Sequence, residues 1–210
     1  MQYRSGERTL RTAVILSSPG PLVLGIGLIV GRSSTQLADF IRRSAELLAI
    51  IVSWIVFRLV HNAEQPDAAR RKHLESIANT SVGAAMCLSG GALVLVALFS
   101  SNTEKGNVVP GLIIAVLGVI TNAWFWLRYR QLDRTKPDAI LAVQSRLYRA
   151  KTLVDLCVAS ALLVVALAPG SPGAWYVDLV GSLVVSVYLL INGVTTIRTK
   201  ALKISRSSPS

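Results

Sequence analysis

The sequence predicts an all-α membrane protein with six transmembrane helices and both termini in the cytoplasm. Three observations predict this class. Of the 210 residues, 52% are hydrophobic and 16% are charged, and the mean hydropathy is +0.53, whereas soluble domains carry about 25% charged residues. The apolar residues fall in long blocks, and the basic residues gather in every second connection between those blocks.

Six apolar blocks are long enough to cross a bilayer, which takes about 20 residues of helix. They define a transmembrane domain over residues 12–198, between an N-terminal arm of residues 1–11 and a short basic tail of residues 199–210. The expected helices run from about Thr12 to Val30, Gln36 to Val60, Glu75 to Phe99, Val108 to Leu127, Ile140 to Ala168 and Trp175 to Ile197.

The basic residues set the expected orientation. Of the 22 Lys and Arg residues, 17 lie in the arm, the 2–3 and 4–5 connections, the entry to the fifth helix and the tail, against Arg32 and Lys105 on the other side. Because loops rich in Lys and Arg stay in the cytoplasm, both termini are expected there. Membrane topology accounts for the net charge of +11, so no nucleic-acid partner is predicted.

Two pairs of opposite charges lie inside predicted membrane helices. Arg42 and Glu46 are four residues apart in the second helix, and Lys151 and Asp155 are four apart in the fifth. This spacing places each pair on one helix face. Charges at bilayer depth are costly and usually mark a transport pathway or a fixed contact between helices. These four residues are therefore the predicted site cluster.

The two charged stretches also carry a resemblance to a known family. The run from Ser33 to Glu46, SSTQLADFIRRSAE, resembles the second-helix signature of the cation diffusion facilitators, and KTLVD, from Lys151 to Asp155, resembles their fifth-helix signature. Asn122, Glu75 and Asp178 also fall where such proteins often carry the same residues. The resemblance implies a secondary transporter, not an enzyme, that exchanges divalent cations such as zinc for protons.

The chain departs from the family pattern at the transport site. The resemblance maps the four metal-binding positions to Arg42, Glu46, Lys151 and Asp155, so only Glu46 and Asp155 remain as metal ligands. The chain also shows only Gln65-Pro66-Asp67 in place of a His-Pro-aromatic-Gly run. We expect it to lack the family's soluble C-terminal domain.

The chemistry of the cluster leaves three interpretations open. Zinc prefers imidazole, thiolate and carboxylate ligands, and an arginine stays protonated and cannot bind a metal. The favoured interpretation is an inherited metal site closed by ion pairs, either Arg42–Asp155 with Lys151–Glu46 or the pairs within each helix. The others are a remodelled site at which a substrate or proton competes for one pair, and metal binding with the cations swung away.

Five further polar residues are accessory candidates: Asp39, Glu75, His73, Asn122 and Asp178. Asp39 is expected to pair with Arg42 or Arg43, one turn away on the same helix. Asp178 is expected to cap the sixth helix. Alternatively, Asp39 and Asp178 together form an acidic vestibule. Asn122 is expected to hydrogen-bond across helices. In the 2–3 region, a weak metal-loading site is one alternative to solvated side chains; its residues would be His61, Glu64, Asp67, His73 and Glu75.

Two other functions remain alternatives to metal transport. One is a structural or partner-binding membrane protein with the transporter fold, and the other is transport of a non-metal substrate. The expected partners are the lipid bilayer and, as an open alternative, a second copy bound through the transmembrane helices. The expected location is the bacterial inner membrane.

Overall fold

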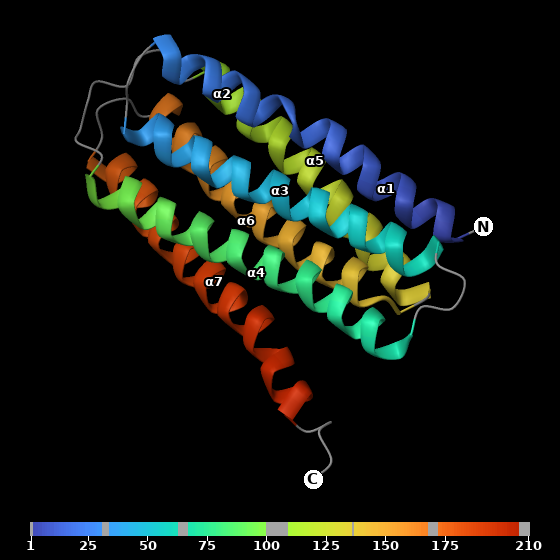
Figure 1. Cartoon of the computed structure of the whole chain (residues 1–210). Coiled ribbons are helices and arrows are strands. Elements are labelled where there is room, and N and C mark those ends of the chain that lie inside the picture. Colours follow the sequence, from blue (N-terminus) through green and yellow to red (C-terminus); the bar gives the residue numbers. More distant parts are fainter. Residues whose placement is uncertain are drawn as a thin grey trace.

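A computed structural model shows seven helices among the described residues, with no strand in that part of the chain (Figure 1). The helices are α1 (Gln2–Ser17), α2 (Pro19–Val30), α3 (Ser34–Asn62), α4 (Ala68–Phe99), α5 (Val109–Thr135), α6 (Ala139–Leu167) and α7 (Pro172–Ser205). The structure describes residues 2–30, 34–62, 67–99, 109–135, 137–167 and 172–205. Within these ranges, no side chain is described for residues 2–4, 27–30, 34–39, 62, 96, 99, 109–111, 165, 172–178, 182 and 199–205.

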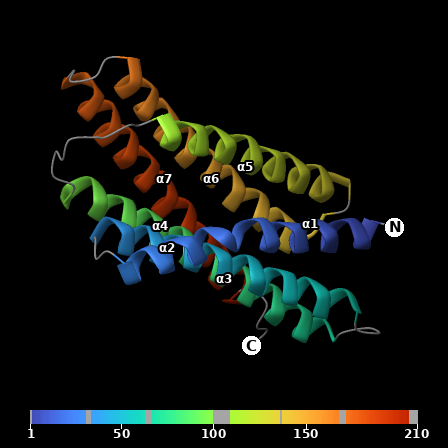
Figure 2. The ribbon, with the colours of Figure 1, turned by 90° about the horizontal axis from the view of Figure 1, so that it is seen from above.

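The helices pack side by side in a closed circuit. α1 and α2 lie against α3, α3 against α4, α4 against α7, α7 against α6, α6 against α5, and α5 returns to α1. Figure 2 shows α1 between α3 and α5, where the circuit closes. α6 also contacts α3 and α4, so the helix with Lys151 and Asp155 lies next to the helix with Arg42 and Glu46.

The first predicted helix is broken in two at Ser18. Pro19 and Pro21 follow the break, and a proline inside a helix removes a backbone hydrogen bond and clashes with the preceding turn. The Ser18 amide still donates to the Val14 carbonyl at 3.0 Å, and its hydroxyl donates to the Ile15 carbonyl at 2.9 Å. α1 and α2 therefore continue end to end as one crossing with a defined kink (Figure 1).

The bundle presents an apolar surface suited to lipid. By length and composition, five helical stretches of the described residues can cross a membrane: Ser5–Ile26, Phe40–His61, Ala68–Leu95, Leu112–Thr135 and Leu179–Arg198. α6 is not among them and carries Arg149, Lys151 and Asp155, but its 29 residues extend about 43 Å, and it packs between α5 and α7. The fold is thus the predicted all-α membrane bundle, and α6 is long enough to cross the bilayer beside the five apolar spans.

Several helices are longer than the hydropathy pattern predicts. α4 begins at Ala68 rather than near Glu75, α5 continues to Thr135, and α7 continues to Ser205. α1 begins at Gln2, so most of the expected N-terminal arm is helical. Hydropathy identifies the part of a helix inside the hydrocarbon, whereas backbone hydrogen bonding continues through polar residues beyond it.

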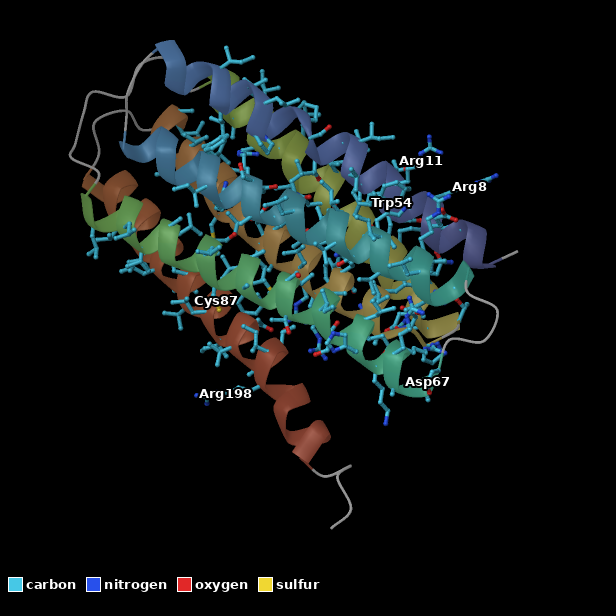
Figure 3. The ribbon with its side chains drawn as sticks, viewed as in Figure 1. Arg8, Arg11, Trp54, Asp67, Cys87 and Arg198 are labelled. Atoms are coloured by element: carbon cyan, nitrogen blue, oxygen red, sulfur yellow. The ribbon has the colours of Figure 1, made fainter. Side chains whose placement is uncertain are left out.

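Glycines allow α4 and α7 to approach closely. A Cβ atom added to Gly193 would lie 2.6 Å from Cys87 Sγ and 2.8 Å from the Gly83 carbonyl oxygen, and one added to Gly83 would lie 2.9 Å from the Gly193 carbonyl oxygen. Small residues commonly serve this purpose between membrane helices. Cys87 lies on α4 (Figure 3) and acts as a packing residue at this contact.

Asp138 fixes the start of α6 and ties it to the end of α3. One carboxylate oxygen accepts hydrogen bonds from the amides of Ile140 at 2.9 Å and Leu141 at 3.2 Å, which is the N-cap arrangement. The other lies 3.3 Å from His61 Nε2, while His61 Nδ1 lies 2.9 Å from the Phe57 carbonyl oxygen. This carboxylate therefore sets the register of α6, and with it the position of the site residues on that helix.

We expect Asp138→Ala to destabilise the protein by about 1–2 kcal/mol, because it removes the N-cap of α6. Asp138→Asn is the matched control, since an asparagine side chain also caps well and cannot pair with a cation. Unfolding of the purified variants in detergent measures both effects. An alanine variant as stable as the wild type would contradict the capping role, and equal losses in the two variants would assign the stability to the His61 contact instead.

Candidate functional site

A cavity of about 670 Å³ lies in the middle of the bundle. It is reached by side chains of all seven helices, and the kink between α1 and α2 contributes Ser17 and Gly20 to its wall. Its charged residues are Arg42, Arg43, Glu46, Lys151 and Asp155. The rest of the wall is largely apolar. The fold therefore collects the four predicted site residues at one cavity.

Glu46 and Lys151 form an ion pair between α3 and α6. Lys151 Nζ lies 3.2 Å from Glu46 Oε2, and the two side chains are only 16% and 11% exposed. The Ser89 hydroxyl on α4 donates to Glu46 Oε1 at 3.0 Å. Both carboxylate oxygens thus have a partner, as a buried carboxylate requires.

Lys151 is also held against an aromatic ring. Its ammonium lies 5.1 Å from the centroid of the Tyr148 ring, one turn earlier on α6, which is within the range of a cation–π contact. Tyr148 packs on Phe125 and Tyr129 of α5, with ring centroids 4.9 and 5.4 Å away. This buried aromatic group fixes the ring, so the direction of the lysine side chain is set by packing as well as by charge.

Asp155 takes a different partner from Glu46. Asn122 Nδ2 on α5 donates to Asp155 Oδ2 at 2.6 Å. A Cβ atom added to Gly118, one turn before Asn122, would lie 2.7 Å from the same oxygen. Because residue 118 has no side chain, the Asp155 carboxylate can pack directly against α5. Asn122 makes the expected hydrogen bond across helices.

Arg42 completes the cluster from α3. It lines the cavity one turn before Glu46, and Arg43, which is exposed, lines it as well, so the cavity reaches the molecular surface. Arg42, Glu46, Lys151 and Asp155 together carry two positive and two negative charges. This four-residue cluster is therefore nearly neutral and is closed by Lys151–Glu46, with the second carboxylate held by an amide, while Arg43 adds an exposed positive charge to the cavity wall.

Two of the remaining predicted residues, Glu75 and His73, do not join this cluster. Glu75 accepts from Arg71 Nε at 3.0 Å on the surface of α4, and His73 is exposed on the same helix. The side chains of Asp39 and Asp178 lie outside the described residues, although both positions are helical. Their expected roles therefore stay predictions.

The alternative of a metal-loading site in the 2–3 region has no geometric support in the described residues. His61 is directed to Asp138 at the start of α6 and Glu75 to Arg71, while Glu64 lies outside the described residues. In the part of the chain that the structure describes, no group of three or more His, Cys, Asp and Glu side chains is placed to hold a metal ion.

Sequence reasoning missed three residues of the site: Ser89, Gly118 and Tyr148. Ser89 precedes Gly90 and Gly91, and the run reads as small-residue packing rather than as a partner for a carboxylate. Gly118 shows its role only through its distance to Asp155. For Tyr148 a signal existed, because it lies three residues before Lys151 and therefore on the same helix face.

Comparison with known protein families gives one match. The model of the cation efflux transmembrane domain matches residues 11–204, which includes every residue of the cavity cluster. No curated protein matches the chain.

Proposed function

Because the chain belongs to the cation efflux family and is an integral membrane cation transporter of that kind, we propose that it exchanges a cation for a proton at the cavity of Arg42, Glu46, Lys151 and Asp155. The observation that carries this proposal is the Lys151–Glu46 ion pair, 3.2 Å long, in the wall of a cavity that reaches the surface. A cation that enters the cavity competes with the lysine ammonium for the same carboxylate.

Lys151 is the group proposed to carry the proton. Of the two basic residues in the cluster, an arginine stays protonated, whereas a lysine can give up its proton when its surroundings change. Cation binding between Glu46 and Asp155 would release one proton from Lys151. Cation release on the other side of the membrane would allow Lys151 to take up a proton and close the ion pair again. Each cycle then moves one cation against one proton.

Charge counting favours a singly charged cargo. With Lys151 neutral, Arg42, Glu46 and Asp155 sum to one negative charge, and a sodium or potassium ion neutralises these three groups. Arg43 also lines the cavity, but it is exposed, so solvent and salt screen its charge. A divalent ion would leave one uncompensated positive charge beside Arg42, and an uncompensated charge in a poorly solvated place is strongly unfavourable. The divalent metal implied by the family resemblance is therefore the less favoured cargo for this chain.

A second function has its own support. Lys151 already neutralises Glu46, and Ser89 and Asn122 hold the two carboxylates in place. A cluster satisfied in this way also suits a structural or partner-binding membrane protein that no longer transports. The two functions differ in one respect: only transport requires Lys151 to lose its proton.

Proteoliposome exchange tests this requirement directly. We expect a gradient of sodium or potassium to drive proton movement that a dye in the lumen reports, with less response to zinc or manganese. Lys151→Arg keeps the positive charge but holds its proton, so the exchange should fall to the level of empty liposomes. Lys72→Arg, the same change at an exposed position on α4, is the matched control and should leave the exchange unchanged.

Each outcome decides between the functions. Exchange that survives Lys151→Arg would show that this lysine is not the proton carrier. Exchange driven by zinc but not by sodium or potassium would refute the singly charged cargo. No exchange with any of these ions, from correctly folded wild-type protein, would favour the structural function.

A further inference from the structure

A second cavity, of about 770 Å³, lies between α1 and α5, apart from the site of the cation. Its wall includes Ser5, Arg8 and Thr12 from α1, and Trp124, Arg128 and Gln131 from α5. We propose that this cavity binds the phosphate headgroup of an anionic phospholipid at the cytoplasmic surface of the membrane.

The two arginines supply the charge that a phosphate group needs. Arg128 donates to the Ser5 hydroxyl at 2.9 Å and to the Gln131 amide oxygen at 3.3 Å. These two neutral partners hold the guanidinium in place without neutralising its positive charge. Glu7, the acidic neighbour of Arg8 in the sequence, is directed to Arg58 at 3.8 Å instead. Guanidinium groups match phosphate oxygens in geometry as well as charge.

The position of the cavity matches the depth of a headgroup. The cavity lies at the end of the bundle where α1 begins and α5 finishes, and Figure 3 shows Arg8 and Arg11 on α1 near the N-terminus. The basic residues of the chain assign this end to the cytoplasm. Trp124 is 54% exposed in the wall, and tryptophan prefers the boundary between headgroups and acyl chains.

Deeper in the bilayer, the outer surfaces of both helices are apolar. Ile15 on α1 is 60% exposed and Ile120 on α5 is 61% exposed. A phospholipid that places its phosphate between Arg8 and Arg128 can therefore lay its acyl chains along these side chains. A free phosphate ion would use the arginines alone, so the surrounding apolar surface favours a lipid. Basic pockets between membrane helices on the cytoplasmic side are suited to such headgroups.

Native mass spectrometry and bilayer fluorescence can test the proposal on the full chain. We expect phosphatidylglycerol to remain bound where phosphatidylcholine does not, and brominated phosphatidylglycerol to quench tryptophan fluorescence more than brominated phosphatidylcholine. Arg8→Gln/Arg128→Gln should weaken the preference for phosphatidylglycerol about tenfold or more, because each basic group near the surface contributes to anionic lipid binding.

The matched control removes one arginine from each of the same two helices. Arg11 and Arg130 are both exposed and do not line the cavity, so Arg11→Gln/Arg130→Gln should keep the preference. An equal loss in both double variants would reduce the effect to general surface charge and overturn the site. Equal protection from thermal unfolding by inorganic phosphate and by phosphatidylglycerol would assign the cavity to a free anion and overturn the lipid.

Discussion

Lys151→Met should destabilise the protein by about 3–5 kcal/mol, because it leaves the Glu46 carboxylate without its cation in a mostly buried place. Glu46→Gln should cost a similar amount for the opposite reason, since it leaves the ammonium of Lys151 without its carboxylate. In the structure the two groups are 3.2 Å apart and 16% and 11% exposed, so solvent can replace little of what each loses.

The double variant Glu46→Gln/Lys151→Met should lose much less than the sum of the two single losses. It removes both charges together and keeps nearly the same side-chain volume, and replacing a buried ion pair by neutral residues is often close to neutral for stability. The free energy of unfolding in mixed detergent micelles measures all three variants. Additive losses would show that the two residues act independently and would contradict the coupling expected of this ion pair.

Ser89→Ala serves as the control for a lost hydrogen bond without a lost charge. Its hydroxyl donates to Glu46 Oε1 at 3.0 Å, and removing one such bond should cost about 1–3 kcal/mol when the acceptor stays buried. A loss in Ser89→Ala as large as that in Lys151→Met would place the stability in the hydrogen-bond network rather than in the ion pair. The order of the losses therefore separates the two contributions.

Most of the membrane architecture could be predicted from the sequence, because hydropathy and charge follow directly from the solvent on each side. The crossings and the assignment of the charged pairs to two neighbouring helices needed no tertiary information. The kink at Ser18 was present in the sequence as Pro19 and Pro21 but is overlooked when apolar length alone defines a helix. The true helix ends, such as Thr135, could not be predicted because helices continue past the hydrocarbon.

The site was predictable as a set of residues but not as a set of contacts. Four-residue spacing placed each charged pair on one face, yet it did not say which partner each charge would choose. The structure shows Lys151 with Glu46 across helices, and Asp155 with Asn122. That choice depends on where Gly118 lets α5 approach α6 and where Ser89 lies on α4, which are properties of packing rather than of local sequence.

The double variant Arg42→His/Lys151→His should acquire a zinc site that the wild type lacks. It would leave two imidazoles and two carboxylates, a ligand set that suits tetrahedral zinc. All four side chains line one cavity, and the contact between positions 46 and 151 is already formed. The charge of the four groups would fall from zero to about −2, with the imidazoles neutral as ligands, which favours a divalent ion.

Zinc should therefore raise the thermal stability of this variant and leave that of the wild type unchanged. Zinc at about 100 times its dissociation constant would contribute about 2.7 kcal/mol, which offsets much of the loss caused by breaking the Lys151–Glu46 ion pair. The melting temperature with and without zinc gives the effect, and the absorption spectrum of bound Co²⁺ reports whether the site is tetrahedral.

Arg42→Gln/Lys151→Gln separates ligation from charge. It produces the same negative cavity but offers no imidazole, so it should bind zinc far more weakly than the histidine variant. Equal zinc-dependent shifts in the two variants would mean that negative charge alone attracts the ion. A folded histidine variant with no shift would mean that positions 42, 46, 151 and 155 do not converge on one ion. A shift confined to the histidine variant would show that this cavity keeps the geometry of a metal site, and that Arg42 and Lys151 are what exclude the metal.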